Sequence, residues 1–237
     1  MRDRIIVALD AGSGHEALSL ARQLHGHAQW VKVGMTLYYA EGPPVVHALR
    51  DMGFDVFVDL KLHDIPHQAQ GAARSLASLG AGMLTVHASG GEQMIRAAVT
   101  GATEGAREAG LAVPKLIAVT VLTSTDDAAL RSLGVSRSTA DQVELLGRIA
   151  RDAGADGVVC SPHEARAMRE AWGGEALIVT PGVRPAGSVA DDQSRVMTPA
   201  EAIAQGASHL VIGRPITGVP DPAQAFEAIV ATMEGAA

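Results

Sequence analysis

The stretch DVFVDLKLHDIPHQ, residues 55–68, carries the pattern on which the fold depends. A short apolar run, VFV (56–58), is followed by the charged residues Asp59 and Lys61. A more polar segment then begins near Pro66. The chain contains eight short, mainly apolar runs of this kind: IIVAL (5–9), WVKVG (30–34), DVFVDL (55–60), MLTVH (83–87), LIAVTVL (116–122), GVVC (157–160), LIVT (177–180) and HLVIG (209–213). Short, nearly continuous apolar runs are typical of buried parallel strands, so the chain predicts eight such strands.

Amphipathic segments separate these runs and predict helices. They cover residues 15–24, 43–52, 68–79, 91–109, 139–153, 164–171, 199–205 and 222–233. Glycines stand between five of these helices and the next strand: Gly53, Gly80, Gly110, Gly154 and Gly206. A glycine in the left-handed conformation commonly closes a helix, so these positions support the predicted helix ends.

Eight strand–helix units in 237 residues are typical of an α/β fold of the (β/α)8 TIM-barrel type. The competing interpretation is an open, doubly wound sheet, which usually has fewer strands and a G-x-G-x-x-G turn after the first. AGSG (11–14) lacks that spacing. No linker or low-complexity block divides the chain, so we expect a single TIM-barrel domain over residues 1–237.

Composition limits the kinds of partner and compartment. Acidic residues number 26 and basic residues 19, and the net charge of −7 argues against nucleic-acid and anionic-membrane partners. Cys160 is the single cysteine, so no intramolecular disulfide can form and a reducing compartment is expected. The first apolar run has five residues, too short for a signal-peptide core, and no run approaches membrane-spanning length. These features predict a cytoplasmic protein.

Charged residues interrupt the apolar pattern at the carboxyl ends of the predicted strands, where TIM barrels form their active sites. Asp59 and Lys61 are two residues apart, and alternation along a strand points both into the barrel beside Lys32 of the neighbouring strand. One such pair would be read as a structural ion pair, but three charges at adjacent strand ends favour catalysis. Asp64 follows the strand as a helix cap or a loop carboxylate, and its spacing assigns no role.

Two further motifs indicate an anion site. TPGVRP (180–185) and VIGRP (211–215) each place a glycine and an arginine, Arg184 or Arg214, after a strand. TIM barrels often bind phosphate in the loops after strands seven and eight. His63, His67 and His87 match no common metal-ligand spacing, so we expect no metal site. His87 is expected to be a hydrogen-bonded strand-end residue with a supporting role.

These motifs resemble those of the orotidine 5′-phosphate decarboxylase family in its bacterial form. Residues 59–66, DLKLHDIP, look like its D-x-K-x-x-D signature with the continuation HDIP. The resemblance spans nearly the whole chain, through IIVALD, VKVG, TVHASGG, VTVLTS, TPGVRP, DDQSRV and VIGRPI in the family's order. The D-x-K-x-x-D core alone is shared with sugar-phosphate decarboxylases and aldolases of the same superfamily, whereas HDIP, TPGVRP and DDQ favour the narrower family.

The resemblance implies decarboxylation of orotidine 5′-phosphate to UMP and carbon dioxide, the last step of de novo pyrimidine nucleotide synthesis, without metal or cofactor. Lys61 would deliver the proton to C6 of the pyrimidine, and Asp59 would lie near the departing carboxylate. Lys32 would link that network to the ribose. Asp64 would reach the site from the second subunit of a homodimer.

The resemblance also implies the residues that bind substrate. Asp10 would bind the ribose hydroxyls, and Thr123 would contact the pyrimidine, a role that Ser124 could share. Ile65 and Gln68 would accompany Asp64 at the partner's site. The phosphate end would be held by Arg184, Gln193, Gly213 and Arg214, with residues 185–193 closing over it.

Two alternatives stay open at this point. A sugar-phosphate decarboxylase or aldolase of the same superfamily would typically need Mg²⁺, so activity that withstands EDTA separates it from the first interpretation. A nucleotide-binding barrel without catalysis would bind UMP tightly but would not turn over substrate, and the fold alone does not distinguish it.

Overall fold

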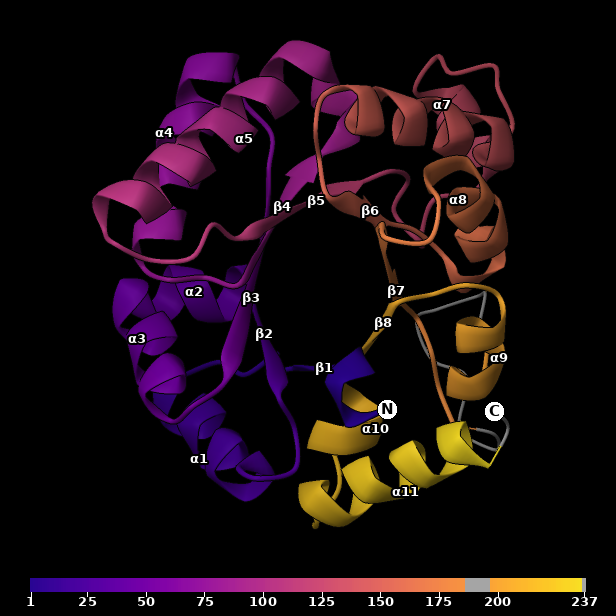
Figure 1. The fold of residues 1–237 in the computed structure, drawn as a ribbon. Coiled ribbons are helices and arrows are strands. Elements are labelled where there is room, and N and C mark those ends of the chain that lie inside the picture. The colour runs from indigo at the N-terminus through magenta and orange to yellow at the C-terminus, as the bar shows by residue number, and fades with distance from the viewer. Residues whose placement is uncertain (186–196, 236–237) are drawn as a thin grey trace.

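Eight parallel strands close into one barrel, in chain order from β1 to β8. The computed structural model describes residues 1–185 and 197–235. The strands are β1 Ile5–Ala8, β2 Trp30–Gly34, β3 Asp55–Leu62, β4 Met83–His87, β5 Lys115–Val119, β6 Gly157–Val159, β7 Leu177–Pro181 and β8 His209–Ile212. Figure 1 shows the strands at the centre and the helices outside them. The predicted (β/α)8 barrel is therefore confirmed.

The helices cover the outer face of the barrel. They are α1 Gly14–Leu24, α2 Met35–Glu41, α3 Pro43–Asp51, α4 Pro66–Ser78, α5 Gly91–Glu108, α6 Asp127–Ser132, α7 Thr139–Asp152, α8 Ala165–Trp172, α9 Pro199–Ala204, α10 Arg214–Thr217 and α11 Pro222–Glu234. Short 3-10 helices lie at η1 Arg2–Arg4, η2 Ala88–Gly90 and η3 Pro162–Glu164. Within the described ranges, no helix has the length and apolar character needed to cross a lipid bilayer.

All eight predicted helices are present, and their ends lie within two residues of the prediction. The five glycines expected to close helices have φ values between 67° and 101°. The helices α2, α6 and α10 were not predicted; each has four to seven residues, which give little 3.6-residue periodicity to detect. Two strand ends differ by two or more residues: β3 continues to Leu62, and β5 ends at Val119 instead of Leu122.

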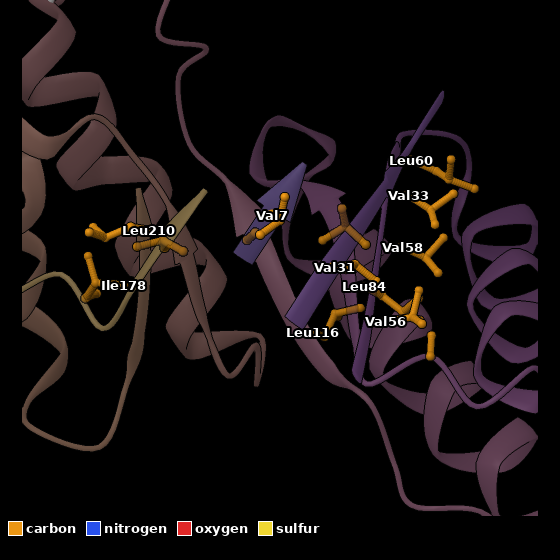
Figure 2. Close-up of a cluster of buried hydrophobic side chains, with 14 of the residues drawn as sticks. Val7, Val31, Val33, Val56, Val58, Leu60, Leu84, Leu116, Ile178 and Leu210 are labelled. Carbon is orange, nitrogen blue, oxygen red and sulfur yellow. The ribbon is translucent and has the colours of Figure 1, made fainter. Parts of the chain in front are cut away.

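The outer faces of the strands form the main core. Figure 2 shows Val56, Val58 and Leu60 of β3 on the same side of the strand, facing the neighbouring helices. All three are at most 8% exposed. Burying an aliphatic side chain of this size contributes about 1.5–3 kcal/mol. This aliphatic layer fixes the helices on the barrel without the help of many aromatic residues.

A second, smaller core fills the inside of the barrel and supports the site. It consists of Ile6, Phe57, Met83, Ile117 and Val179, one each from β1, β3, β4, β5 and β7. In β3, Asp59 follows Phe57 of this layer by two residues, so its side chain lies on the same face, one step nearer the carboxyl end of the strand. The interior therefore changes from apolar to charged toward the carboxyl ends of the strands.

Candidate active site

A cavity of 310 Å³ opens at the mouth formed by the carboxyl ends of the strands. Phe57, Val159 and Val211 belong both to its lining and to the packed interior, so they form its apolar floor. Val119, Val121, Pro181 and Val183 continue the apolar lining. Eight of the twelve predicted site residues line this one cavity: Asp10, Lys32, Asp59, Lys61, Thr123, Arg184, Gly213 and Arg214.

Four charged side chains on one side of the cavity form what we call the charged network: Asp10, Lys32, Asp59 and Lys61. The Lys61 ammonium lies 2.9 Å from Asp59 Oδ2, and the Lys32 ammonium lies 3.6 Å from the same oxygen. Lys32 Nζ also donates to Asp10 Oδ1 at 3.1 Å. The predicted Lys–Asp–Lys array is therefore present, extended by a fourth charge.

Burial makes this network costly unless its charges compensate one another. The side chains of Lys32 and Asp59 are only 10% and 12% exposed. The network contains two positive and two negative groups that alternate in space, so each ammonium faces a carboxylate. The chain has three lysines in all, and two of them line this cavity. Such a concentration of paired charges in a cleft is typical of a catalytic site.

The backbone that carries Lys61 departs from a regular strand. In the β3–β4 ladder Val58 pairs with Leu84 and Leu62 pairs with Val86, so residues 59–61 face one residue of β4. Lys61 has φ of 52°, and among the described residues it is the only non-glycine with a positive φ. The expected proximity of Asp59 and Lys61 is confirmed, but the simple alternation from which we predicted it is wrong, because a bulge interrupts the strand.

Two arginines also line the cavity. Arg184 lies in the segment after β7, where its backbone N–H donates to Met197 O at 3.1 Å. Arg214 is the first residue of α10, directly after Gly213. A Cβ added to Gly213 would lie 3.7 Å from Asp10 Oδ2, so the residue before Arg214 adjoins the charged network. Cavity lining by both arginines is the arrangement that the sequence predicts for a phosphate site.

Three predicted residues do not line the cavity of their own chain. Asp64, Ile65 and Gln68 lie on the surface, and Ile65 is 64% exposed. Asp64 is a loop carboxylate whose Oδ1 accepts the N–H of Ile65 at 2.7 Å, and α4 begins at Pro66, two residues before the predicted start. Gln193 lies outside the described residues.

The histidines near the network have a different arrangement from the one we predicted. The ring of His87 lies 5.2 Å from the ring of His63, centroid to centroid, and this ring forms no hydrogen bond with any described residue. Burial lowers the pKa of His87, and His63 and Lys61 nearby lower it further, so the ring is mainly neutral at pH 7. In residues 1–185 and 197–235, no group of three or more His, Cys, Asp or Glu side chains is placed to hold a metal ion.

Sequence reasoning missed two residues that shape the site. Thr85 of β4 contacts Asp59, and Gly34 of β2 leaves the space that Lys32 and Asp10 occupy. Thr85 alternates with Met83, which lies in the interior cluster, so its inward orientation could have been read from the strand pattern. Between the two candidates for the pyrimidine contact, Thr123 lines the cavity and Ser124 does not.

Fold and cavity together define a (β/α)8 barrel with a charged binding site at the mouth where its strands end. Comparison with known proteins narrows this class. The chain belongs to the orotidine 5′-phosphate decarboxylase / HUMPS family, whose family model matches residues 3–229.

Individual relatives cover nearly the whole chain. Orotidine 5′-phosphate decarboxylase of Moorella thermoacetica is 52% identical over 234 residues, which are 98% of this chain and 93% of that protein. The enzyme of the same name from Parasynechococcus marenigrum is 51% identical, covering 98% of this chain and 95% of its own. The crystal structure of orotidine 5′-phosphate decarboxylase from Lactobacillus acidophilus superimposes with a TM-score of 0.86 at 42% identity, covering 98% and 99% of the two chains.

Proposed function

We propose that this protein decarboxylates orotidine 5′-phosphate to UMP and carbon dioxide, without a metal or cofactor. The observation that carries the proposal is one cavity lined both by a paired Lys–Asp network and by two arginines. This combination suits a substrate that carries both a reacting carbon and a phosphate. Relatives at 50–52% identity that bear the name of this enzyme support the same substrate.

The order of the strands around the barrel suggests how the nucleotide lies. Arg184 and Arg214, after β7 and β8, would hold the phosphate. Asp10, after β1, would bind the ribose hydroxyls, with Lys32 of β2 beside it. The pyrimidine would then extend over Asp59 and Lys61 of β3 toward Thr123 and the apolar side chains of β5 and β6, and the reacting carbon would face the network.

The chemistry follows from the positions of the charged groups. Loss of carbon dioxide leaves an electron pair on C6 of the ring, and the Lys61 ammonium would stabilise that charge and then transfer its proton to C6. Asp59 would lie against the substrate carboxylate, so their repulsion falls as carbon dioxide leaves. Contacts of the phosphate far from C6 would supply binding energy that orients the ring.

The direct test uses purified protein treated with EDTA and follows the ultraviolet absorbance of orotidine 5′-phosphate. We expect conversion to UMP by the wild type and loss of nearly all turnover in Lys61→Ala, with binding of UMP retained. Lys115→Ala is the matched control, because Lys115 pairs with Asp156 at the amino end of β5, away from the cavity. Conversion that requires added Mg²⁺ would favour the sugar-phosphate alternative, and UMP binding without turnover would favour a binding protein.

We further propose a homodimer in which Asp64, Ile65 and Gln68 complete the site of the partner. Support comes from the exposure of every residue from 63 to 68, directly after the strand that carries Lys61. An isoleucine that is 64% exposed next to a carboxylate suits a surface that a second subunit covers. We also expect the enzyme to work in the cytoplasm, and the single, fully buried thiol of Cys160 agrees with a reducing compartment.

Complementation tests the shared site. Asp64→Ala and Lys61→Ala homodimers should each be nearly inactive. Mixing them should restore activity, up to about a quarter of the wild-type value per subunit, because half of the subunits enter hybrid dimers and each hybrid holds one intact site. Confirmed subunit exchange without recovery would contradict the shared site while leaving the decarboxylation proposal in place.

A further inference from the structure

Thr85 occupies the position opposite the bulge in β3. Residues 59, 60 and 61 face this one residue of β4, because the ladder resumes only at Leu62 and Val86. A bulge leaves backbone groups without their ladder partners. Lys61 is in addition held at φ of 52°, a conformation that a non-glycine residue keeps only when its surroundings enforce it.

The hydroxyl of Thr85 makes two hydrogen bonds whose direction is fixed by chemistry. Its Oγ1 accepts the backbone N–H of Lys61 at 2.9 Å, since that group can only donate. The same hydroxyl donates to Asp59 Oδ1 at 2.9 Å, since a carboxylate can only accept. Thr85 is 2% exposed, so water does not readily replace it in either bond.

The two carboxylate oxygens of Asp59 therefore have different partners. Oδ1 receives the Thr85 hydroxyl, and Oδ2 faces both ammonium groups, at 2.9 Å from Lys61 and 3.6 Å from Lys32. Without the hydroxyl, the carboxylate would be free to rotate about its last bond, and the partly buried N–H of Lys61 would lose its acceptor. Both changes would displace the Lys61 ammonium from its place beside Asp59.

We propose that Thr85 is a positioning residue, whose hydroxyl holds the left-handed backbone of Lys61 and the rotation of the Asp59 carboxylate in one geometry. The inference rests on the proposed decarboxylase function, in which Lys61 and Asp59 face the reacting carbon. Thr85 does not line the cavity, so it acts on the reaction through these two residues and not through the substrate.

The test compares variants that keep or remove the hydroxyl. Thr85→Val keeps the shape of threonine, and kcat for orotidine 5′-phosphate should fall about 10- to 100-fold, while KM changes less than about threefold. Thr85→Ser restores the hydroxyl and should keep kcat within about threefold of wild type. Thr120→Val is the matched control. Thr120 is 4% exposed and its hydroxyl donates to the backbone oxygen of Val159, so kcat should change less than about twofold.

A second pair of variants tests the inference even if the Thr85→Val protein folds poorly. Thr85→Ala and Thr85→Ser differ only by the hydroxyl, and both are compared at equal melting temperature and equal UMP affinity. A kcat ratio above about 10 in favour of serine supports the inference. Equal kcat values in this pair, or a folded Thr85→Val enzyme with wild-type kcat, would overturn it while the decarboxylase function stands. A wild-type protein that does not convert orotidine 5′-phosphate would overturn the function and this inference together.

Discussion

Gly34 lies next to Asp59 in the β2–β3 ladder, two residues after Lys32. The space where its side chain would stand is filled by the charged network. A Cβ built at this position would lie 3.1 Å from Lys32 Nζ and 3.3 Å from Asp10 Oδ1. Its φ of −87° is open to any residue, so the glycine is required here by space and not by backbone conformation.

Gly34→Ala should therefore disturb catalysis more than folding. The added methyl displaces the Lys32–Asp10 pair by a few tenths of an ångström, and kcat/KM for orotidine 5′-phosphate should fall about 3- to 10-fold. Gly174→Ala is the control, because a Cβ at that position meets nothing within 4 Å. Steady-state kinetics decide the matter: a Gly34→Ala enzyme with wild-type kcat/KM would show that the network tolerates the methyl.

The contact between helices α4 and α5 supports the region of Asp64, Ile65 and Gln68, which we propose to face the partner subunit. Gly101 and Gly105 of α5 let the two helices approach closely. A Cβ at Gly101 would lie 2.0 Å from the backbone oxygen of Gln70, and one at Gly105 would lie 2.1 Å from that of Arg74. These oxygens belong to the backbone of α4 and cannot move aside alone. Helix α4 begins at Pro66, so its placement also fixes where Asp64 leaves the barrel.

Gly105→Ala should push the two helices apart and lower the free energy of unfolding by about 1–3 kcal/mol. Urea denaturation at fixed protein concentration measures this change. Gly71→Ala in α4 is the matched control, since a Cβ there meets nothing within 4 Å and alanine favours helix by about 0.5–1 kcal/mol. Equal destabilisation by both variants would contradict the close packing of α4 on α5.

The whole molecule carries two partly buried histidines with lowered pKa values. Burial is the main cause for both His87 and His209, aided by His63 and Lys61 at the first and by Arg4 at the second. In the unfolded chain these rings titrate at their ordinary pKa of 6.5. Below that pH the unfolded chain binds more protons at these two rings than the folded chain does, so the free energy of unfolding decreases.

Thermal stability should consequently decrease as the pH falls from 6.5 toward the lowered folded-state pKa values, and further acidification should add no more from these two groups. His209→Gln should make the melting temperature less dependent on pH in this window, because glutamine carries no proton to exclude. The same substitution at the exposed His47 serves as the control. A slope as steep in His209→Gln as in the wild type would remove His209 from this account.

Local sequence patterns predicted the order and type of the main elements. Apolar runs such as residues 30–34 and 83–87 became strands, and amphipathic segments such as 91–109 became helices, because periodicity is a local property of the chain. These patterns also indicated that Lys32, Asp59, Lys61, Arg184 and Arg214 would share one cavity, since the carboxyl ends of parallel strands meet at one mouth.

The contacts that hold the charged network in place could not be predicted from these local patterns. The bulge at residues 59–61, the left-handed backbone of Lys61 and the double role of the Thr85 hydroxyl all depend on the register between β3 and β4. The space above Gly34 depends in the same way on two side chains that meet from β2 and from the segment after β1. Register and close approach join residues far apart in sequence, and a local pattern carries no information about them.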